Sequence, residues 1–422
     1  MDAKLRSFLK SISGETFTSL SVRNYRLYYI GQIISTSGTF MQTVAQGWLV
    51  LQLTNSGTAL GIVSALQYLP LLILGPWGGV IADRYNKRRI LFFTQSFAGL
   101  LALVLGVLVV TGLVQLWMIY VLAFCLGLNS VIDNPTRLTF YIELVGPDRL
   151  RNAVTLYSTL VNVSRVVGPA LAAGLIAGVG IGTCFLINGI SYFAVVITLA
   201  LMNKSEIAVS QPIPKAKGQL VEGIKYIVST PLIGYPILVM AILGTFTYEF
   251  QVTLPLMVKN VLHSDAGGYA YLTAAMGLGA SIGGLYFAGR KRGSPSRIGP
   301  AVLLFGLAVL AVSLMPDLHM AGVAMAVVGF CSINYSTLGS TTVQLESSPE
   351  MRGRVMSFWS ASFLGMTTIG GPIIGAFAEI AGARGSLMLG GVAALLAAGI
   401  AIVKIKNPLT NQVLAISGPG KK

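Results

Sequence analysis

Four ionisable side chains lie inside long apolar stretches of the sequence, well away from the ends of those stretches: Asp133, Arg137, Arg165 and Glu249. Charges are costly in an apolar medium, so each is a candidate functional group. Asp133 and Arg137 are four residues apart and share a helix face, although Pro135 disturbs the geometry between them. Arg165 is expected to reach Asp133 from the following helix. Two interpretations stay open: an ion pair that only joins two helices, or a pair in which Asp133 exchanges a proton as its contacts change.

The fourth group, Glu249, has no oppositely charged partner within its own predicted helix. Burial without a partner favours the neutral form of a carboxylic acid, which suits a side chain that takes up and releases protons. The alternative is a water-exposed side chain that lines an outer vestibule. We prefer proton exchange, and we assign all four groups to proton coupling.

Neutral polar side chains form a stripe within residues 27–53. Gln32, Ser35, Thr39, Gln42 and Gln46 follow spacings of 3, 4, 3 and 4 residues, which places them on one helix face. Amides without charge suit a bulky, weakly polar molecule better than a sugar phosphate or an amino acid. The alternative is that the stripe only joins neighbouring helices. The residues expected to line a substrate cavity are Gln32, Thr39, Gln42, Gln46, Asn129, Asn162 and Asn334.

The composition indicates which elements position these groups. Apolar residues make up 54% of the 422 residues and charged residues only 10%, whereas soluble domains carry about 25% charged residues. A soluble fold is therefore excluded. Charge-free runs extend over 27–82, 90–132 and 166–203, which are 56, 43 and 38 residues long. One crossing of a bilayer takes about 20 residues, so each of these runs holds two helices.

We therefore predict an all-α membrane protein with twelve transmembrane helices. Turn signals divide the long runs at 54–57, 111–112 and 178–182. Twelve crossings place both termini on one side of the membrane, and that side carries 25 of the 29 basic residues. Basic loops mark the cytoplasmic face, so the positive charges are orientation signals and not a nucleic-acid-binding surface. The predicted helices are 27–53, 57–82, 90–111, 113–143, 150–177, 182–202, 231–259, 266–289, 298–315, 319–345, 354–379 and 385–404.

The two halves of the chain resemble each other. A shift of 203 residues places Glu143 on Glu346, Arg149 on Arg352, Arg151 on Arg354, and Gly168-Pro169 on Gly371-Pro372. Two related six-helix halves, with a substrate site between them, are the plan of many secondary transporters. The predicted segments are a cytoplasmic N-terminal segment (1–26), a six-helix bundle (27–202), a cytoplasmic linker (203–230), a second six-helix bundle (231–404) and a cytoplasmic tail (405–422).

Three motifs connect this plan with a known family. Residues 79–89, Gly-Val-Ile-Ala-Asp-Arg-Tyr-Asn-Lys-Arg-Arg, resemble the major facilitator superfamily signature G-x-x-x-D-R-x-x-[RK]-[RK] between the second and third helices. Asp-Asn-Pro-Thr-Arg at 133–137 and Arg165-x-x-Gly168-Pro169 resemble the macrolide-efflux and siderophore-export branch, the third drug:proton antiporter group or transmembrane secretion effectors. Many relatives have N-F-Q-V where this chain has Glu-Phe-Gln-Val at 249–252, which adds an acid. The resemblance implies two pseudo-symmetric six-helix bundles.

The resemblance also implies a cytoplasmic gate. Asp83, at the end of the second helix, is expected to pair with nearby arginines and with the start of the eleventh helix in one transport state. The alternative is that such charges only fix topology and helix ends, which we consider sufficient for the basic cluster 87–89. The Gly-Pro pairs are expected to permit helix bends. The predicted gating residues are Gly79, Asp83, Arg84, Arg88, Glu143, Arg149, Arg151, Gly168, Pro169, Glu346, Arg352, Arg354, Gly371 and Pro372.

The function expected from these features is proton-coupled efflux of amphipathic drugs or metabolites by alternating access, in the bacterial inner membrane. A dedicated siderophore exporter or a lysolipid transporter of the same fold is the alternative. A membrane-embedded enzyme is disfavoured because the sequence contains no Walker A motif, no Gly-x-Ser-x-Gly and no cluster of metal ligands. We expect a monomer whose partners are a small-molecule substrate, protons and the lipid bilayer, with no cofactor or metal.

Overall fold

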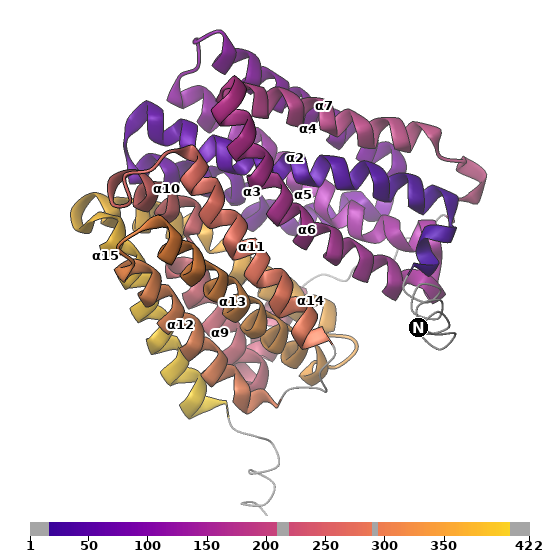
Figure 1. Ribbon diagram of the computed structural model, residues 1–422. Coiled ribbons are helices and arrows are strands. Elements are labelled where there is room, and N and C mark those ends of the chain that lie inside the picture. The colour runs from indigo at the N-terminus through magenta and orange to yellow at the C-terminus, as the bar shows by residue number, and fades with distance from the viewer. Residues whose placement is uncertain (1–16, 209–218, 289–293, 406–422) are drawn as a thin grey trace, which may run out of the picture. The chain divides into compact units, whose positions relative to one another are not determined.

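A computed structural model describes residues 17–208, 219–288 and 294–405 (Figure 1). The described residues form helices joined by short connections and contain no strand. This is what apolar surroundings demand, because a helix satisfies its backbone hydrogen bonds internally. The helices are α2 (Arg23–Thr54), α3 (Gly57–Arg84), α4 (Lys87–Val110), α5 (Leu116–Val145), α6 (Pro147–Val179), α7 (Ile181–Leu201), α8 (Gln219–Ser229), α9 (Pro231–Phe246), α10 (Phe250–Asn260), α11 (Ala266–Ala288), α12 (Ile298–Leu314), α13 (Leu318–Glu346), α14 (Arg352–Ser360) and α15 (Thr367–Lys404).

Four short elements complete the described chain: the 3-10 helices η1 (Thr18–Ser21), η2 (Lys204–Glu206) and η3 (Pro295–Arg297), and the π-helix η4 (Ala361–Gly365). Parts of the predicted N-terminal segment (1–26), linker (203–230) and tail (405–422) lie outside the described residues. Within the linker, the structure shows the helix α8, which the sequence analysis did not predict.

The predicted turns coincide with the observed helix ends. Asn55 separates α2 from α3 and has a φ of 51°, while Gly180 separates α6 from α7 and has a φ of 90°. Gly112, just after α4, has a φ of 71°. Positive φ values favour glycine and asparagine, so these residues end their helices for a local steric reason.

Ten helical segments among the described residues are long and apolar enough to cross a membrane, two fewer than the twelve predicted. The predicted first helix is present as α2, but its glutamines, serines and threonines make it too polar to be among the ten. The segment Arg352–Lys404 counts as one span of 53 residues. Gly382, with a φ of 72°, interrupts its helical backbone between the predicted helices 354–379 and 385–404. Most helices lie where predicted, but the predicted helix 231–259 is divided into α9 and α10, and the predicted helix 354–379 is interrupted by η4. Twelve crossings remain a prediction.

The chain divides into two compact units. The first comprises residues 1–49 and 69–214, and the second comprises residues 50–68 and 215–422. Residues 50–68, the end of α2 and the first part of α3, pack with the second unit, and the predicted six-helix halves stay a prediction. Helix α3 therefore contributes to both units.

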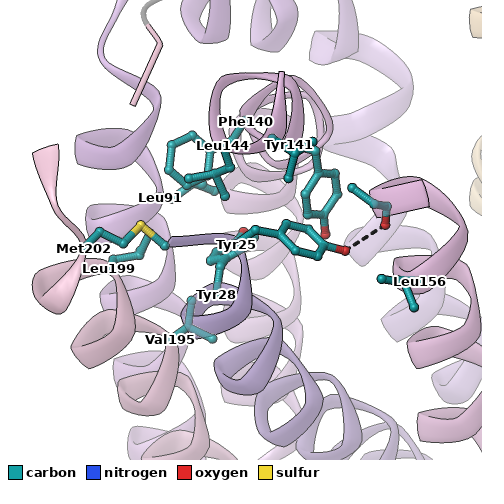
Figure 2. Packing of buried hydrophobic residues seen from close by; sticks show 12 residues of the cluster. Tyr25, Tyr28, Leu91, Phe140, Tyr141, Leu144, Leu156, Val195, Leu199 and Met202 are labelled. Carbon is teal, nitrogen blue, oxygen red and sulfur yellow. Dashed lines mark hydrogen bonds between the residues drawn. The ribbon is translucent and has the colours of Figure 1, made fainter. Parts of the chain in front are cut away.

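An aromatic core joins the helices of the first unit. Tyr25 and Tyr28 of α2 are both 0% exposed. Tyr25 lies beside Tyr141 of α5, with ring centroids 6.0 Å apart, and Tyr28 lies 5.6 Å from Phe140 (Figure 2). The Tyr25 hydroxyl donates to the Ala153 carbonyl of α6 at 2.9 Å. This core holds α2 and α6 next to the part of α5 that carries the predicted ion pair.

Two irregularities interrupt the helices of the second unit. α9 ends at Phe246 and α10 begins at Phe250, so Glu249 lies in the break between them. The second irregularity is the π-helix η4, which precedes α15. The two lie close together because Gly244, near the end of α9, carries no side chain: a Cβ there would collide with the Ser362 carbonyl oxygen in η4. Such irregular turns often accompany functional sites.

Candidate functional site

Asp133, in the first unit, is a buried carboxylate with both oxygens hydrogen-bonded. The residue is 3% exposed. Oδ1 accepts from the Thr94 hydroxyl at 2.6 Å and from the Gln95 amide at 2.8 Å, both on α4. Oδ2 accepts from the Arg137 guanidinium one turn further along α5. Three donors, one of them cationic, provide what an ionised carboxylate needs in an apolar interior.

Arg137 and Arg165 are both partly exposed and have different surroundings. Arg137 Nη1 also donates to the Gln32 side-chain oxygen at 3.2 Å, which links the ion pair of α5 to α2. Arg165 on α6 places its guanidinium 5.7 Å from the centre of the Phe40 ring, a cation–π contact. The pairing of Asp133 with Arg137 is therefore present, and a pairing of Asp133 with Arg165 stays a prediction.

Glu249, in the second unit, is equally buried but less well satisfied. Its side chain is 2% exposed, and Oε1 has no hydrogen-bond partner among the described residues. The Thr367 hydroxyl, at the start of α15, is the polar group that faces the carboxyl. Gly370, one turn later, leaves the space for this acid, because a Cβ there would lie 2.9 Å from Oε1. Glu249 is thus an acid at a helix break, without a cation beside it in the contacts that the structure describes.

The polar stripe of α2 is largely turned towards neighbouring helices of the same unit. Gln42, 9% exposed, accepts a hydrogen bond from Asn188 of α7 at 2.6 Å. The hydroxyls of Thr39 and Tyr192, also on α7, are 3.2 Å apart. These contacts favour helix joining for Gln42, in line with the alternative interpretation of the stripe. A cavity-lining role stays a prediction for the whole set, of which Gln32 and Asn129 are buried and Gln46, Asn162 and Asn334 are partly exposed.

The basic cluster after α3 does more than mark orientation. Lys87 is 6% exposed and donates to Glu143 Oε1 at 2.6 Å, which joins the start of α4 to the end of α5. Arg88 donates from Nε to the Leu199 carbonyl at 2.7 Å, near the end of α7. Carbonyls in the last turn of a helix lack internal partners, so a cation there stabilises the helix end. The Arg88 contact agrees with the expectation that this cluster fixes topology and helix ends, whereas the ion pair between Lys87 and Glu143 was not expected.

In the second unit, Arg354 pairs with a residue that the sequence analysis did not consider. Its Nη1 donates to Glu222 Oε2 of α8 at 2.6 Å. The Tyr226 hydroxyl of α8 accepts the backbone N–H of Ser348 at 3.1 Å. Gly223 lies against Phe358 of α14. α8 is therefore attached to the segment that precedes and begins α14, where gating residues were predicted.

The remaining predicted gating residues have local contacts. Arg352 donates from Nε to the Gln344 carbonyl at 3.0 Å, and Arg149 donates to the Ser21 hydroxyl at 3.4 Å. Arg84, Arg151 and Glu346 are exposed, and Gly79 and Asp83 are partly exposed. Both Gly-Pro pairs lie inside helices, where Gly168 packs against Phe40 and Gly371 against Gly61. A gating role for these residues stays a prediction.

The described residues contain no group of three or more His, Cys, Asp or Glu side chains placed to hold a metal ion. The three cysteines are free, with Cys184 and Cys331 buried and Cys125 partly exposed.

Long apolar helices with buried ion pairs and a buried acid at a helix break define a multi-pass membrane transporter. The chain belongs to the family of transmembrane secretion effectors, whose pattern matches residues 14–418. This places it among transporters of the major facilitator type and not among enzymes.

Curated relatives and solved structures agree with this family. The chain is 26% identical over 363 residues to the enterobactin exporter EntS of Escherichia coli O1:K1, which covers 83% of this chain and 84% of EntS. It is 31% identical to the staphyloferrin A transporter of Staphylococcus aureus over 161 residues. This match covers 38% of this chain and 41% of that relative. A bacterial homologue of the human lysosomal transporter Spinster has the same fold, with a TM-score of 0.73, 15% identity, and coverage of 92% of this chain and 97% of that one.

Proposed function

We propose that the chain is a proton-coupled exporter of amphipathic small molecules that works by alternating access, and that siderophores are its substrates. In this proposal twelve helices cross the bacterial inner membrane in two six-helix bundles, and both termini are cytoplasmic.

Glu249 is the observation that carries the proposal. A buried carboxylate with an unbonded oxygen lacks the contacts that stabilise a negative charge, so proton uptake neutralises it at low cost. Its position between α9 and α10 supports the same role, because secondary transporters place coupling-ion sites at discontinuous helices. A side chain that only joined helices would need a partner, and none is described for Oε1.

Asp133 has the complementary role in the proposal. Arg137, Thr94 and Gln95 all donate hydrogen bonds to its two carboxylate oxygens. It exchanges a proton only if Arg137 moves away during the transport cycle. Arg165, on the neighbouring helix α6, is the second cation available to it.

The substrate class follows from the relatives. Two of them are named for enterobactin and staphyloferrin A, which are both siderophores, and the exporter match spans most of both chains. Multidrug efflux is the second candidate, favoured by the uncharged polar face of α2 that includes Thr39 and Gln46.

Counterflow in proteoliposomes tests the substrate class separately from the coupling, because it needs no ion gradient. Liposomes loaded with iron-free enterobactin, staphyloferrin A, ethidium or lysophosphatidylcholine are diluted into the same labelled compound. We expect saturable exchange of at least one siderophore. Exchange of ethidium alone would favour the multidrug alternative, and exchange of lysophosphatidylcholine alone would favour the lysolipid alternative. If none of the four is exchanged by correctly folded protein, the proposed substrate classes are wrong.

A further inference from the structure

Buried polar atoms without a hydrogen-bond partner are unevenly distributed in this protein. Seven such side-chain atoms occur among the described residues, and five of them belong to α2 and α5 in the first unit. On α2 they lie on Tyr28, Gln32 and Thr36, one helical turn apart, and on α5 they lie on Arg137 and Tyr141, again one turn apart. We call these five residues the α2–α5 polar cluster.

Four members of the cluster contact each other without satisfying each other. Gln32 and Arg137 share one hydrogen bond, of 3.2 Å, which leaves Gln32 Nε2 and Arg137 Nε unbonded. The rings of Tyr28 and Tyr141 lie 6.0 Å apart, yet neither hydroxyl has a partner. The Tyr28 hydroxyl also faces the Gln32 side chain without a hydrogen bond of good geometry.

Five unbonded groups in one place require an explanation, because native proteins hydrogen-bond nearly all buried polar atoms. Leaving them unbonded would destabilise the very helices that hold Asp133. By contrast, the neighbouring Tyr25 and Tyr29 hydroxyls donate to the Ala153 and Leu156 carbonyls of α6 at 2.9 and 3.2 Å. The same aromatic core therefore contains satisfied and unsatisfied tyrosines side by side.

The chemistry of the cluster identifies the class of ligand. Gln32 Nε2 and Arg137 Nε are donors only, so the ligand must accept hydrogen bonds. Tyr28, Gln32 and Tyr141 are 0%, 1% and 2% exposed, so a ligand at these three residues must be small. Water both accepts and donates, and a buried water molecule makes about three hydrogen bonds, a need that polar atoms on adjacent turns can meet.

We propose that the α2–α5 polar cluster binds a short file of ordered water molecules that hydrates the Asp133–Arg137 ion pair. The file follows α2 and α5 from Thr36 towards the Tyr25–Tyr141 contact near one end of both helices. Hydration lets Arg137 leave Asp133 without exposing either charge to an apolar interior, so the pair can rearrange. This role does not depend on which acid carries a transported proton.

Radiolytic footprinting of the full chain in detergent tests the proposal directly, because X-rays generate hydroxyl radicals from bound water beside buried side chains. We expect Tyr28 and Tyr141 to be oxidised several-fold faster than Tyr335. Tyr335 is the matched control: it is 0% exposed, and its hydroxyl donates to the Pro236 carbonyl at 3.1 Å. Equal oxidation rates at the three tyrosines would overturn the proposal.

Phenylalanine substitutions give a second, independent measurement. Tyr28→Phe and Tyr141→Phe keep the ring packing and remove one hydroxyl each. If the hydroxyls hold water, both variants melt at a lower temperature than the wild type, as Tyr25→Phe must after losing its 2.9 Å bond to Ala153. If the hydroxyls hold nothing, their removal eliminates unbonded polar groups and raises the melting temperature. An unchanged or higher melting temperature in both variants, beside a lower one in Tyr25→Phe, contradicts the water file.

Discussion

Glu379 of α15 accepts hydrogen bonds from the Ser56 hydroxyl and from the backbone N–H of Thr58, the latter at 3.1 Å. An acid at this position suits the first turn of α3, where N–H groups lack partners inside the helix. On the same two helices, Gly57 of α3 lies against the backbone of Gly375 of α15, and Gly61 lies against Gly371. This α3–α15 contact explains why residues 50–68 pack with the second unit.

Gly375→Val is predicted to weaken the α3–α15 contact. The new side chain would overlap the Gly57 carbonyl, which cannot move without shifting α3. We expect a loss of about 1–3 kcal/mol in the free energy of unfolding, measured by SDS titration. Gly399→Val on the same helix is the control, because nothing lies within 4 Å of its Cβ position. Equal losses for the two substitutions would show that the α3–α15 contact does not contribute to the free energy of unfolding.

Gly370→Ala is predicted to displace the Glu249 side chain. The added methyl would meet the Thr245 carbonyl and Glu249 Oε1. We expect substrate-driven proton flux to fall about tenfold, equivalent to about 1.4 kcal/mol of barrier, while counterflow persists. Gly284→Ala, with open space at its Cβ position, should leave flux unchanged. Normal proton flux in Gly370→Ala would show that this glycine is not needed for the function of Glu249.

Asp133→Asn is predicted to destabilise the first unit because it leaves Arg137 buried without a counter-charge. Breaking a buried pair costs about 3–5 kcal/mol. The double variant Asp133→Asn/Arg137→Gln should recover part of this loss, which a double-mutant cycle of unfolding free energies measures. Additive losses would mean that the two side chains do not interact energetically.

Lys87→Gln and Arg89→Gln remove the same charge from one basic cluster but should differ in effect. Lys87 is 6% exposed and donates to Glu143, so its loss removes a buried ion pair and should cost about 3 kcal/mol. The Arg89 side chain is exposed, and its loss should change the unfolding free energy by about 0.5 kcal/mol or less. If the cluster served only as an orientation signal, the two variants would be equally stable.

Much of the fold follows from local sequence. Charge-free runs place the helices, and Asn55, Gly112 and Gly180 end them because these residues tolerate positive φ. The Asp133–Arg137 pair follows from their four-residue spacing on one helix.

The partners that come from distant parts of the chain did not follow from the sequence. Thr94 and Gln95 carry no charge and lie about 40 residues before Asp133, so no local pattern connects them with it. The π-helix η4 contains no proline, and its wider turn depends on packing against α9. Glu222 did not follow from the sequence because it lies in the predicted linker, 132 residues before Arg354.

The central claim is that Glu249 carries the transported proton. Its most direct test is substrate-driven proton movement in proteoliposomes with an internal pH dye, comparing the wild type with Glu249→Gln. We expect saturable proton movement in the wild type and none in Glu249→Gln, while counterflow shows that the variant still folds and exchanges substrate. Proton movement of normal rate and stoichiometry in Glu249→Gln would contradict the account.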